Sequence, residues 1–359
     1  MAGDLQIGGL PLVRLHAMDA PADGPAFLEA MVLPGRGMML LQARLRLPSG
    51  EAVDALASPD PDAAARKLDG GPEDFAGDNS FSFGGAILAP YANRIRGRAL
   101  AGSREIETTV AGRTVRLPRN WGGQAPGAEQ YAMHGLILDA QVAWTQGAPN
   151  RVSGRLDAGD FGGRWPGRAV LTFDWRLEGG GLSLGVTAEN VGDEALPMGL
   201  GWHPYFALPS GDRRQARLWT AGHARALVNN YDEVLPTGAV EAVAGGAYDF
   251  SAPGGRALGD LYLDDCFNDL ARGDGGTVAE VRDPASGLGL RVASPSSQVR
   301  ALQVYAPPDR GVVVIEPQFN LADPFGPEWG GRDTGMALIP PDGRVSYDVR
   351  VTAFALGNR

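Results

Sequence analysis

Apolar and polar residues alternate along several stretches of the chain, and this period-2 pattern predicts β-strands. Between residues 39 and 47 the odd positions are apolar, the later even positions are polar, and a Pro-Ser-Gly sequence follows. Apolar residues also occupy every second position in 169–177 and again in 182–188, on either side of a glycine-rich turn. We therefore predict a half-buried strand over 39–47 and a β-hairpin over 169–188, the hairpin with one face on a core.

The last part of the chain adds strands of the same kinds. The run Val-Val-Val-Ile at 312–315 predicts a buried strand, 347–355 alternates again, and 301–305 resembles a strand with one polar residue. Long helical periodicity is scarce, although an Asp-Pro sequence predicts a short helix over 60–66. The segment 69–79 is rich in Gly and acidic residues and is predicted to be a loop.

No other sequence feature favours a different architecture. No G-x-G-x-x-G follows a predicted strand, and neither a Walker-type loop nor an internal repeat stands out. The pattern therefore predicts an all-β sandwich of many strands, formed as a single domain over residues 1–359.

Composition narrows the classes of partner. The chain has 359 residues, 44% of them hydrophobic and 21% charged, and a formal net charge of −10, which argues against nucleic acid or an anionic membrane as the main partner. Cys266 is the only cysteine, so no intrachain disulfide and no Cys-rich metal site can form. No secretory leader and no run of about eighteen apolar residues is recognisable. We expect a cytoplasmic protein.

Histidines are rare in this chain and one of them has an unusual setting. His203 follows a Trp and precedes a Pro-Tyr-Phe run, so flat apolar faces and a titratable group lie together. A sugar site needs this mixture, because a pyranose ring stacks on apolar faces while its hydroxyls exchange protons. The alternative is a core histidine held by a backbone carbonyl, and spacing alone leaves both interpretations open.

Glu316 is the most informative single residue. It follows the buried Val-Val-Val-Ile run, and Pro317 is expected to end the strand directly after it. Because an unpaired buried charge is costly, this carboxylate must be either paired or functional. A structural salt bridge with an arginine is the alternative to a catalytic role.

Other polar residues stand in settings that suit a binding site. Asn93 and Arg94 follow an aromatic residue, and arginine offers fixed donors for sugar oxygens, although a surface arginine is the commoner case. His134 is isolated in an apolar context, Asp264 lies in a strand or a solvated turn, and Gln303 is the polar residue of its predicted strand.

Taken in order, these motifs resemble the aldose 1-epimerase (galactose mutarotase) family. The resemblance extends from about Pro34 to Phe354 and includes a closing Ile-Pro-Pro-Asp-Gly sequence. The motifs that carry it are Asn93-Arg94-Ile95, His134-Gly135, His203-Pro204-Tyr205-Phe206, Asp264 with Phe267, and Glu316.

The resemblance implies a fold, a reaction and a role for each matched residue. The family's fold is a large antiparallel β-sandwich, the galactose mutarotase-like supersandwich. Its reaction interconverts the α and β anomers of a free aldose and uses neither a metal nor an organic cofactor. By this resemblance Glu316 takes the proton of the anomeric hydroxyl and His203 protonates the ring oxygen. The remaining matched residues would bind the monosaccharide: Asn93, Arg94, His134, Asp264 and Gln303.

Departures from the family pattern leave the identity of the sugar open. Ala207 follows the His-Pro-Tyr-Phe run where many members have Asn, and Leu136 follows the His-Gly pair where a second glycine is usual. A free hexose, a pentose and a phosphorylated hexose all remain possible substrates. Arg94, Arg96 and Arg98 would share one face of an alternating strand and could receive a phosphate, but only Arg94 matches the family, so we favour a neutral sugar.

Two other function classes compete with the epimerase. A sugar-binding or sensor protein would not need both Glu316 and His203. A glycoside hydrolase or lyase on a related sandwich usually needs two carboxylates, and only Asp264 could join Glu316. His16 and His223 have no family match and are expected to be structural or surface residues. The oligomeric state stays open.

Overall fold

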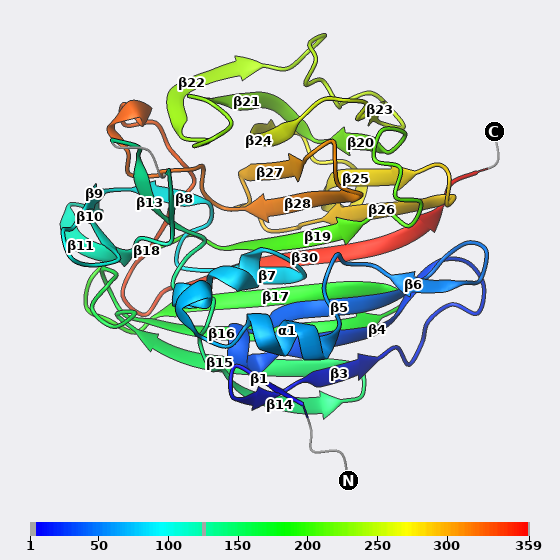
Figure 1. The fold of residues 1–359 in the computed structure, drawn as a ribbon, viewed down its shortest axis with the longest axis horizontal. Coiled ribbons are helices and arrows are strands. Elements are labelled where there is room, and N and C mark those ends of the chain that lie inside the picture. The colour runs from blue at the N-terminus through cyan, green and yellow to red at the C-terminus, as the bar shows by residue number, and fades with distance from the viewer. Residues whose placement is uncertain (1–4, 124–126, 358–359) are drawn as a thin grey trace.

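The computed structural model describes residues 5–123 and 127–357. Two large antiparallel sheets dominate the fold, and the main hydrophobic core draws residues from both (Figure 1). The nine-stranded sheet has the order β14 (Ala143–Ala148), β15 (Arg151–Gly159), β16 (Ala169–Glu178), β17 (Gly181–Asn190), β30 (Arg344–Ala355), β26 (Leu288–Ala293), β25 (Thr277–Asp283), β20 (Arg217–Thr220) and β23 (Arg256–Ala257).

The second sheet has eleven strands, and its middle strands are central to the site. Its order is β22 (Pro236–Ala242), β21 (Gly222–Val228), β24 (Leu263–Leu270), β27 (Ala301–Ala306), β28 (Val312–Gln318), β19 (Gly201–Ala207), β7 (Gly85–Leu88), β5 (Met39–Arg46), β4 (Ala26–Leu33) and β3 (Val13–His16), with β6 (Ala52–Asp54) paired to β5.

Smaller elements surround the two sheets. Short sheets are formed by β12 (Trp121–Gly122), β13 (Gln130–Met133) and β8 (Arg94–Arg96), by β11 (Arg113–Pro118), β10 (Glu105–Val110) and β9 (Arg98–Ala99), by β1 (Gln6–Ile7) and β2 (Leu10–Pro11), and by β18 (Leu196–Met198) and β29 (Ala337–Ile339). The helical elements are α1 (Pro61–Lys67) and the 3₁₀ segments η1 (Pro34–Arg36), η2 (Pro72–Phe81), η3 (Asp274–Gly276) and η4 (Pro327–Trp329).

The strongest sequence predictions are confirmed. Strand β5 covers residues 39–46 of the predicted 39–47 stretch, although it is mostly buried rather than half-buried, and β16 with β17 forms the predicted hairpin. Its turn consists of Gly179 and Gly180, both with positive φ (55° and 69°), a conformation that glycine adopts without steric cost. Helix α1 begins as expected after Asp60, whose carboxylate accepts a hydrogen bond from the Ala63 N–H.

One local prediction is confirmed only in part and another is wrong. The predicted loop over 69–79 overlaps η2, but residues 74–77 have non-helical backbone angles, and Asp74 forms a buried double hydrogen bond with Arg36 at 2.9 Å. Pro317 does not end its strand, because β28 continues to Gln318. A proline lacks only its N–H, and the carbonyl of Pro317 still accepts a hydrogen bond from the Tyr347 hydroxyl at 2.6 Å.

Side-chain alternation on β19 separates core from site. Trp202 and Phe206 point into the main core. There the ring of Trp202 packs edge to face against the ring of Trp175, which belongs to the nine-stranded sheet, with a centroid distance of 5.5 Å. His203 and Tyr205, at the alternate positions, therefore face the other side of the eleven-stranded sheet. This alternation places the polar residues of the motif away from the sandwich interior.

Within the described ranges, no helix is long and apolar enough to cross a membrane.

Candidate functional site

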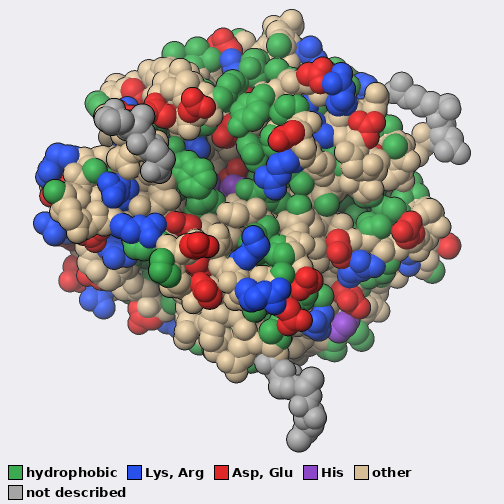
Figure 2. Space-filling model, viewed as in Figure 1, with side chains coloured by type: hydrophobic (Ala, Val, Ile, Leu, Met, Phe, Trp, Pro, Cys, Tyr) green, Lys and Arg blue, Asp and Glu red, His purple; other side chains and the backbone are tan. Residues whose placement is uncertain are grey.

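A cavity of about 300 Å³ opens on the outer face of the eleven-stranded sheet. In Figure 2 hydrophobic side chains flank a hollow in which a histidine is visible. All seven residues predicted as site residues line the cavity: Asn93, Arg94, His134, His203, Asp264, Gln303 and Glu316. The rest of its lining consists of Phe81, Ser82, Trp121, Met133, Tyr205, Tyr231, Asp232, Val234, Tyr262, Tyr305 and Arg310.

Strand register brings the proposed acid and base together. Strands β19 and β28 pair so that Gly201 is opposite Gln318 and Tyr205 is opposite Val314, which places His203 opposite Glu316. On the other side of β28, Glu316 pairs directly with Gln303 of β27. Opposite residues in an antiparallel sheet project from the same face, so the three polar side chains emerge side by side.

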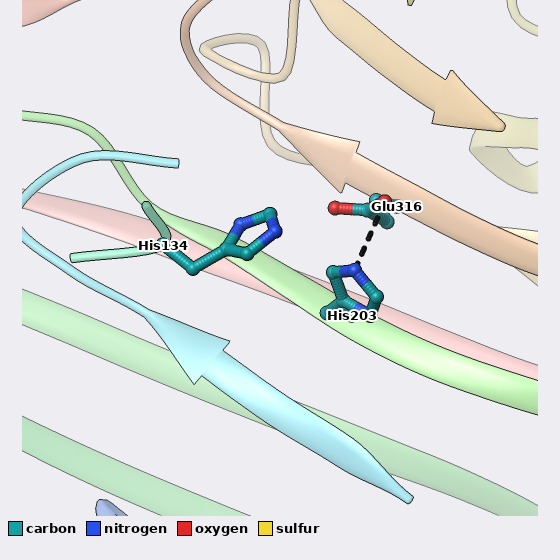
Figure 3. Close-up of side chains that lie close together, drawn as sticks. All are labelled: His134, His203 and Glu316. Carbon is teal, nitrogen blue, oxygen red and sulfur yellow. Dashed lines mark ion pairs between the residues drawn. The ribbon is translucent and has the colours of Figure 1, made fainter. Parts of the chain in front are cut away.

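His203 and Glu316 are in contact in a buried setting. His203 Nε2 lies 3.4 Å from Glu316 Oε1, and the two residues are only 5% and 2% exposed. The His134 ring lies edge to face with the His203 ring at a centroid distance of 4.8 Å. Figure 3 shows both imidazoles and the carboxylate directed toward one small space. A ligand atom in that space can therefore be reached by all three groups.

Asn93 and His134 reach the cavity through an unusual backbone. Both have positive φ (62° and 63°), and the His134 N–H donates to the Asn93 carbonyl at 2.8 Å. The next residue, Gly135, also has positive φ (92°), and a Cβ there would lie 2.2 Å from the Ala89 carbonyl oxygen. Only glycine fits this close approach, which explains the His-Gly pair seen in the sequence.

Two polar networks orient the remaining site residues. Arg94 donates through Nη1 to the Val234 carbonyl at 3.0 Å, so its guanidinium is anchored against the segment that follows β21. Asn93 Nδ2 donates to Gln303 Oε1 at 3.1 Å, and Gln303 Nε2 donates to Asp264 Oδ1 at 2.5 Å. Gln303 therefore bridges two other predicted binding residues.

Burial sets the protonation of the site. It raises the pKa of Glu316 well above its usual range; the nearby charge of Asp264 adds to this shift and Arg94 opposes it. Burial also raises the pKa of Asp264, against the effects of Arg94 and of the hydrogen bond from Gln303. It lowers the pKa of His203 to about 4 and that of His134 well below its usual range. Without a ligand, the neutral forms of Glu316 and His203 are therefore favoured.

The protein leaves several buried polar atoms of this cavity without hydrogen bonds. Across the described residues, no partner is found for Asn93 Oδ1, Arg94 Nε, His134 Nδ1 or Glu316 Oε2. Buried polar atoms are normally paired, because an unmade hydrogen bond costs about 1–3 kcal/mol. All four residues line the same cavity, and a ligand with many hydroxyl groups could supply the missing hydrogen-bond partners.

The same residues include a possible metal-binding set. Ligand atoms of His134, His203 and Glu316 lie within 4.8 Å of one another. Two histidines and a glutamate hold zinc in some enzymes, where tetrahedral bonds of about 2.0–2.1 Å place ligand atoms roughly 3.4 Å apart. The His203–Glu316 contact of 3.4 Å meets this requirement, but a spread of 4.8 Å does not. The trio would have to contract to enclose an ion.

The structure also shows which sequence expectations miss the site. Of the three aromatic residues around His203 in the sequence motif, Tyr205 lines the cavity, while Trp202 and Phe206 belong to the core. As expected, His16 and His223 are exposed surface residues outside the cavity. The sequence interpretation missed five aromatic residues of the lining: Phe81, Trp121, Tyr231, Tyr262 and Tyr305. Only Tyr305 carried a local signal, since it lies two positions from Gln303 on one strand face.

The predicted basic face does not form. Arg94 is buried in the cavity, whereas Arg96 pairs with Asp323 at 2.8 Å and Arg98 with Glu107 at 2.5 Å. Arg98 lies on β9, which belongs to a different sheet from β8, so it does not continue the alternation of Arg94 and Arg96 on β8.

Comparison with known proteins gives a consistent result. A family model described as aldose 1-epimerase matches residues 50–334. The structure of the GalM/aldose epimerase homologue from C. elegans has a TM-score of 0.72 at 16% identity, over 96% of this chain and 99% of its own. A galactose mutarotase-like protein from Clostridium acetobutylicum has a TM-score of 0.71 at 18% identity, over 92% of this chain and 93% of its own. Galactose 1-epimerase from Lactobacillus acidophilus NCFM has a TM-score of 0.64 at 19% identity, over 94% of this chain and 93% of its own.

These structural matches establish the galactose mutarotase-like fold predicted from the sequence. The curated proteins contain no match to the chain.

Proposed function

Because the chain belongs to the aldose 1-epimerase family, we propose that it interconverts the α and β anomers of a free aldose. The observation that carries this proposal is the buried contact between Glu316 and His203 in a cavity whose lining residues include several with unpaired buried polar atoms. Exchange of the anomers needs a base at the anomeric hydroxyl and an acid at the ring oxygen, and it needs no covalent nucleophile.

The proposed reaction moves one proton between the two residues. The Glu316 carboxylate accepts the proton of the anomeric hydroxyl while the protonated His203 donates to the ring oxygen, and the bond from C1 to that oxygen breaks. The aldehyde end then rotates about the C1–C2 bond. Ring closure on the other face returns both protons. The pair holds one proton in total throughout, so proton exchange with water is not required.

The raised pKa of Glu316 and the lowered pKa of His203 fit this cycle. In the empty cavity the single proton is favoured on Glu316. A bound sugar would donate a hydrogen bond to the Glu316 carboxylate and accept one from the protonated His203. Both contacts favour an ionised Glu316 and a protonated His203. Substrate binding itself would therefore move the proton from Glu316 to His203, which is the arrangement that starts the reaction.

The other cavity residues would hold the sugar. Arg94 and His134 can donate to the ring oxygen or to neighbouring hydroxyls, and Asp264 can accept from hydroxyls. Gln303 already bonds Asn93 and Asp264, so we assign it mainly to orienting those two residues. We favour a neutral sugar, because Arg96 and Arg98 are engaged by carboxylates outside the cavity.

Polarimetry on freshly dissolved sugars tests this function. We expect the purified protein to accelerate mutarotation of at least one of α-glucose, α-galactose and α-xylose, with first-order approach to the same final rotation as the uncatalysed reaction. Glucose 6-phosphate serves as a charged comparison, and a much higher kcat/KM for it would contradict the neutral-sugar assignment. Tight sugar binding without any acceleration would instead favour a sensor protein.

Metal removal should not affect the reaction. The proposed proton transfers engage His203 and Glu316 with sugar oxygens, which leaves no complete ligand set for an ion among the residues that the structure describes. We therefore expect full mutarotase activity after exhaustive dialysis against EDTA. Loss of activity that one divalent metal restores would contradict the mechanism and favour metal ligation by His134, His203 and Glu316.

A further inference from the structure

The segment that follows β28 is fastened to the backbone around Arg94. Strand β28 carries Glu316, and after it ends the chain passes beside β8 (Figure 1). Two side chains of this segment make the contacts: Asn320, which is fully buried, and Asp323, which is 3% exposed. We name residues 320–323 the clamp segment.

The side chain of Asn320 pairs with a backbone in the way that a neighbouring strand would. Its Oδ1 accepts a hydrogen bond from the Ala92 N–H at 3.1 Å, and its Nδ2 donates to the Ala92 carbonyl at 2.9 Å. The same Nδ2 also donates to the Leu321 carbonyl at 3.0 Å. The backbone of Gly199 lies so close to this amide that a Cβ there would be 2.0 Å from Asn320 Oδ1. One enclosed amide therefore satisfies both polar groups of Ala92.

Asp323 extends the attachment along β8. Its N–H donates to the Arg94 carbonyl at 2.6 Å. Its Oδ1 accepts from the Arg96 N–H at 3.0 Å, and its Oδ2 accepts from Arg96 Nε at 2.8 Å. Strand β8 is the edge strand of its three-stranded sheet and pairs with β13 on the other side. The clamp segment thus occupies the free edge of β8.

These contacts fix a stretch of backbone that carries site residues. Ala92 and Arg94 flank Asn93, whose positive φ (62°) is uncommon for residues other than glycine. The Asn93 carbonyl in turn accepts a hydrogen bond from the His134 N–H at 2.8 Å. Through these bonds the clamp segment connects the strand of the proposed base to three of the residues proposed to hold the sugar.

Another buried asparagine shows what a contact remote from the cavity looks like. Asn190, at the end of β17, is also 0% exposed, and its Nδ2 donates to the Glu194 and Ile339 carbonyls at 2.7 and 2.8 Å. Its Oδ1 accepts a third backbone hydrogen bond. Neither Asn190 nor its partners line the cavity. Asn320 differs because its partner Ala92 directly precedes two residues of the lining.

We propose that Asn320 is a positioning residue of the sugar site, which holds the backbone of Ala92 so that the residues after it reach the sugar. The inference rests on the proposed function, since it takes the cavity as the sugar site. Binding residues must be held to within about 0.5 Å of the productive geometry. Without the amide of Asn320, both polar groups of Ala92 lose their partner, and the residues that follow lose the fixed position that binding needs.

The effect should appear in KM rather than in kcat. Glu316 and His203 are on β28 and β19, which pair with each other without a contribution from the clamp segment. A substitution that raises KM and leaves kcat unchanged removes binding that is equal in the ground state and the transition state. A purely structural loss has a different signature. Unfolded molecules lower the apparent kcat, and the KM of the molecules that remain folded does not change.

The test compares Asn320→Asp with the matched control Asn190→Asp by polarimetry. Asn320→Asp keeps the shape of the side chain but replaces the donating Nδ2 by an oxygen, which repels the Ala92 carbonyl. With whichever of glucose, galactose and xylose reacts fastest, we expect KM to rise at least about tenfold and kcat per folded molecule to stay within about threefold. Asn190→Asp loses equivalent hydrogen bonds and should leave KM unchanged. Circular dichroism on the same preparations gives the folded fraction.

An unchanged KM in folded Asn320→Asp overturns the positioning role, and so do equal increases of KM in the two asparagine variants. If Asn320→Asp does not fold, Asp323→Asn is the milder variant. It keeps an oxygen for the Arg96 N–H but removes the charge that faces the guanidinium, so KM should rise about threefold. An unchanged KM in this variant overturns the proposal as well.

Failure of the proposed function gives a different result. If the wild type accelerates mutarotation of none of the three sugars, calorimetric titration with them replaces KM by Kd, and a tenfold weaker Kd in Asn320→Asp still supports positioning. If no sugar binds, NMR of the histidine rings decides. A shift of the His134 resonance, with the exposed His16 and His223 unmoved, supports the role of Asn320 in holding the cavity residues. An unmoved His134 resonance overturns it.

Discussion

Replacement of Glu316 by glutamine is expected to lower kcat for mutarotation by at least about 100-fold. General acid–base catalysis typically contributes about 10²–10⁴-fold, and the amide keeps the shape of the side chain but cannot accept the proton. The KM should change less, because Arg94, His134 and Asp264 still contact the sugar. Polarimetric progress curves over a range of sugar concentrations measure both constants.

Stability measurements distinguish catalysis from a structural role for Glu316. Burial raises the pKa of this carboxyl group above its value in the unfolded chain, so at neutral pH the group costs stability, because the unfolded chain ionises it freely and the folded chain does not. The uncharged Glu316→Gln variant should then melt at the same or a higher temperature than the wild type. Glu189→Gln, which changes an exposed carboxylate on β17, is the matched control and should keep full activity. A folded Glu316→Gln variant with more than about a tenth of the activity would exclude this residue as the base.

The second large effect is expected for His203→Asn. Asparagine keeps a polar group beside the ring oxygen but cannot donate and recover a proton near neutral pH, so kcat should again fall at least about 100-fold. The matched control is His223→Asn, since His223 is an exposed histidine on β21. The mutarotation rate and the melting temperature should be measured on the same preparations.

Combining the two substitutions tests whether the residues act together. The proposed mechanism moves one proton within a single event, so the double variant should be little slower than either single variant. If the reduction in kcat of the double variant equals the product of the two single reductions, the residues act independently. If loss of activity follows loss of folded protein in every variant, the pair is a structural contact instead.

The sequence by itself determined the class of fold and the direction in which the main site residues point. The alternation in 169–188 predicts a hairpin because successive side chains of a strand face opposite sides, a property of the local backbone. The same alternation separates Trp202 from His203 and Ile315 from Glu316. The resemblance of the motifs then identified seven residues that all line one cavity.

Only the tertiary structure decided how those residues meet and what surrounds them. The 3.4 Å contact of His203 with Glu316 depends on the register between β19 and β28, which long-range pairing sets. Trp121 and Tyr231 reach the cavity mouth from segments whose local sequence carries no signal for a site. The pKa shifts of Glu316 and His203 arise mainly from burial. Burial depends on packing between segments that are distant in sequence, so no local pattern of residues could show it.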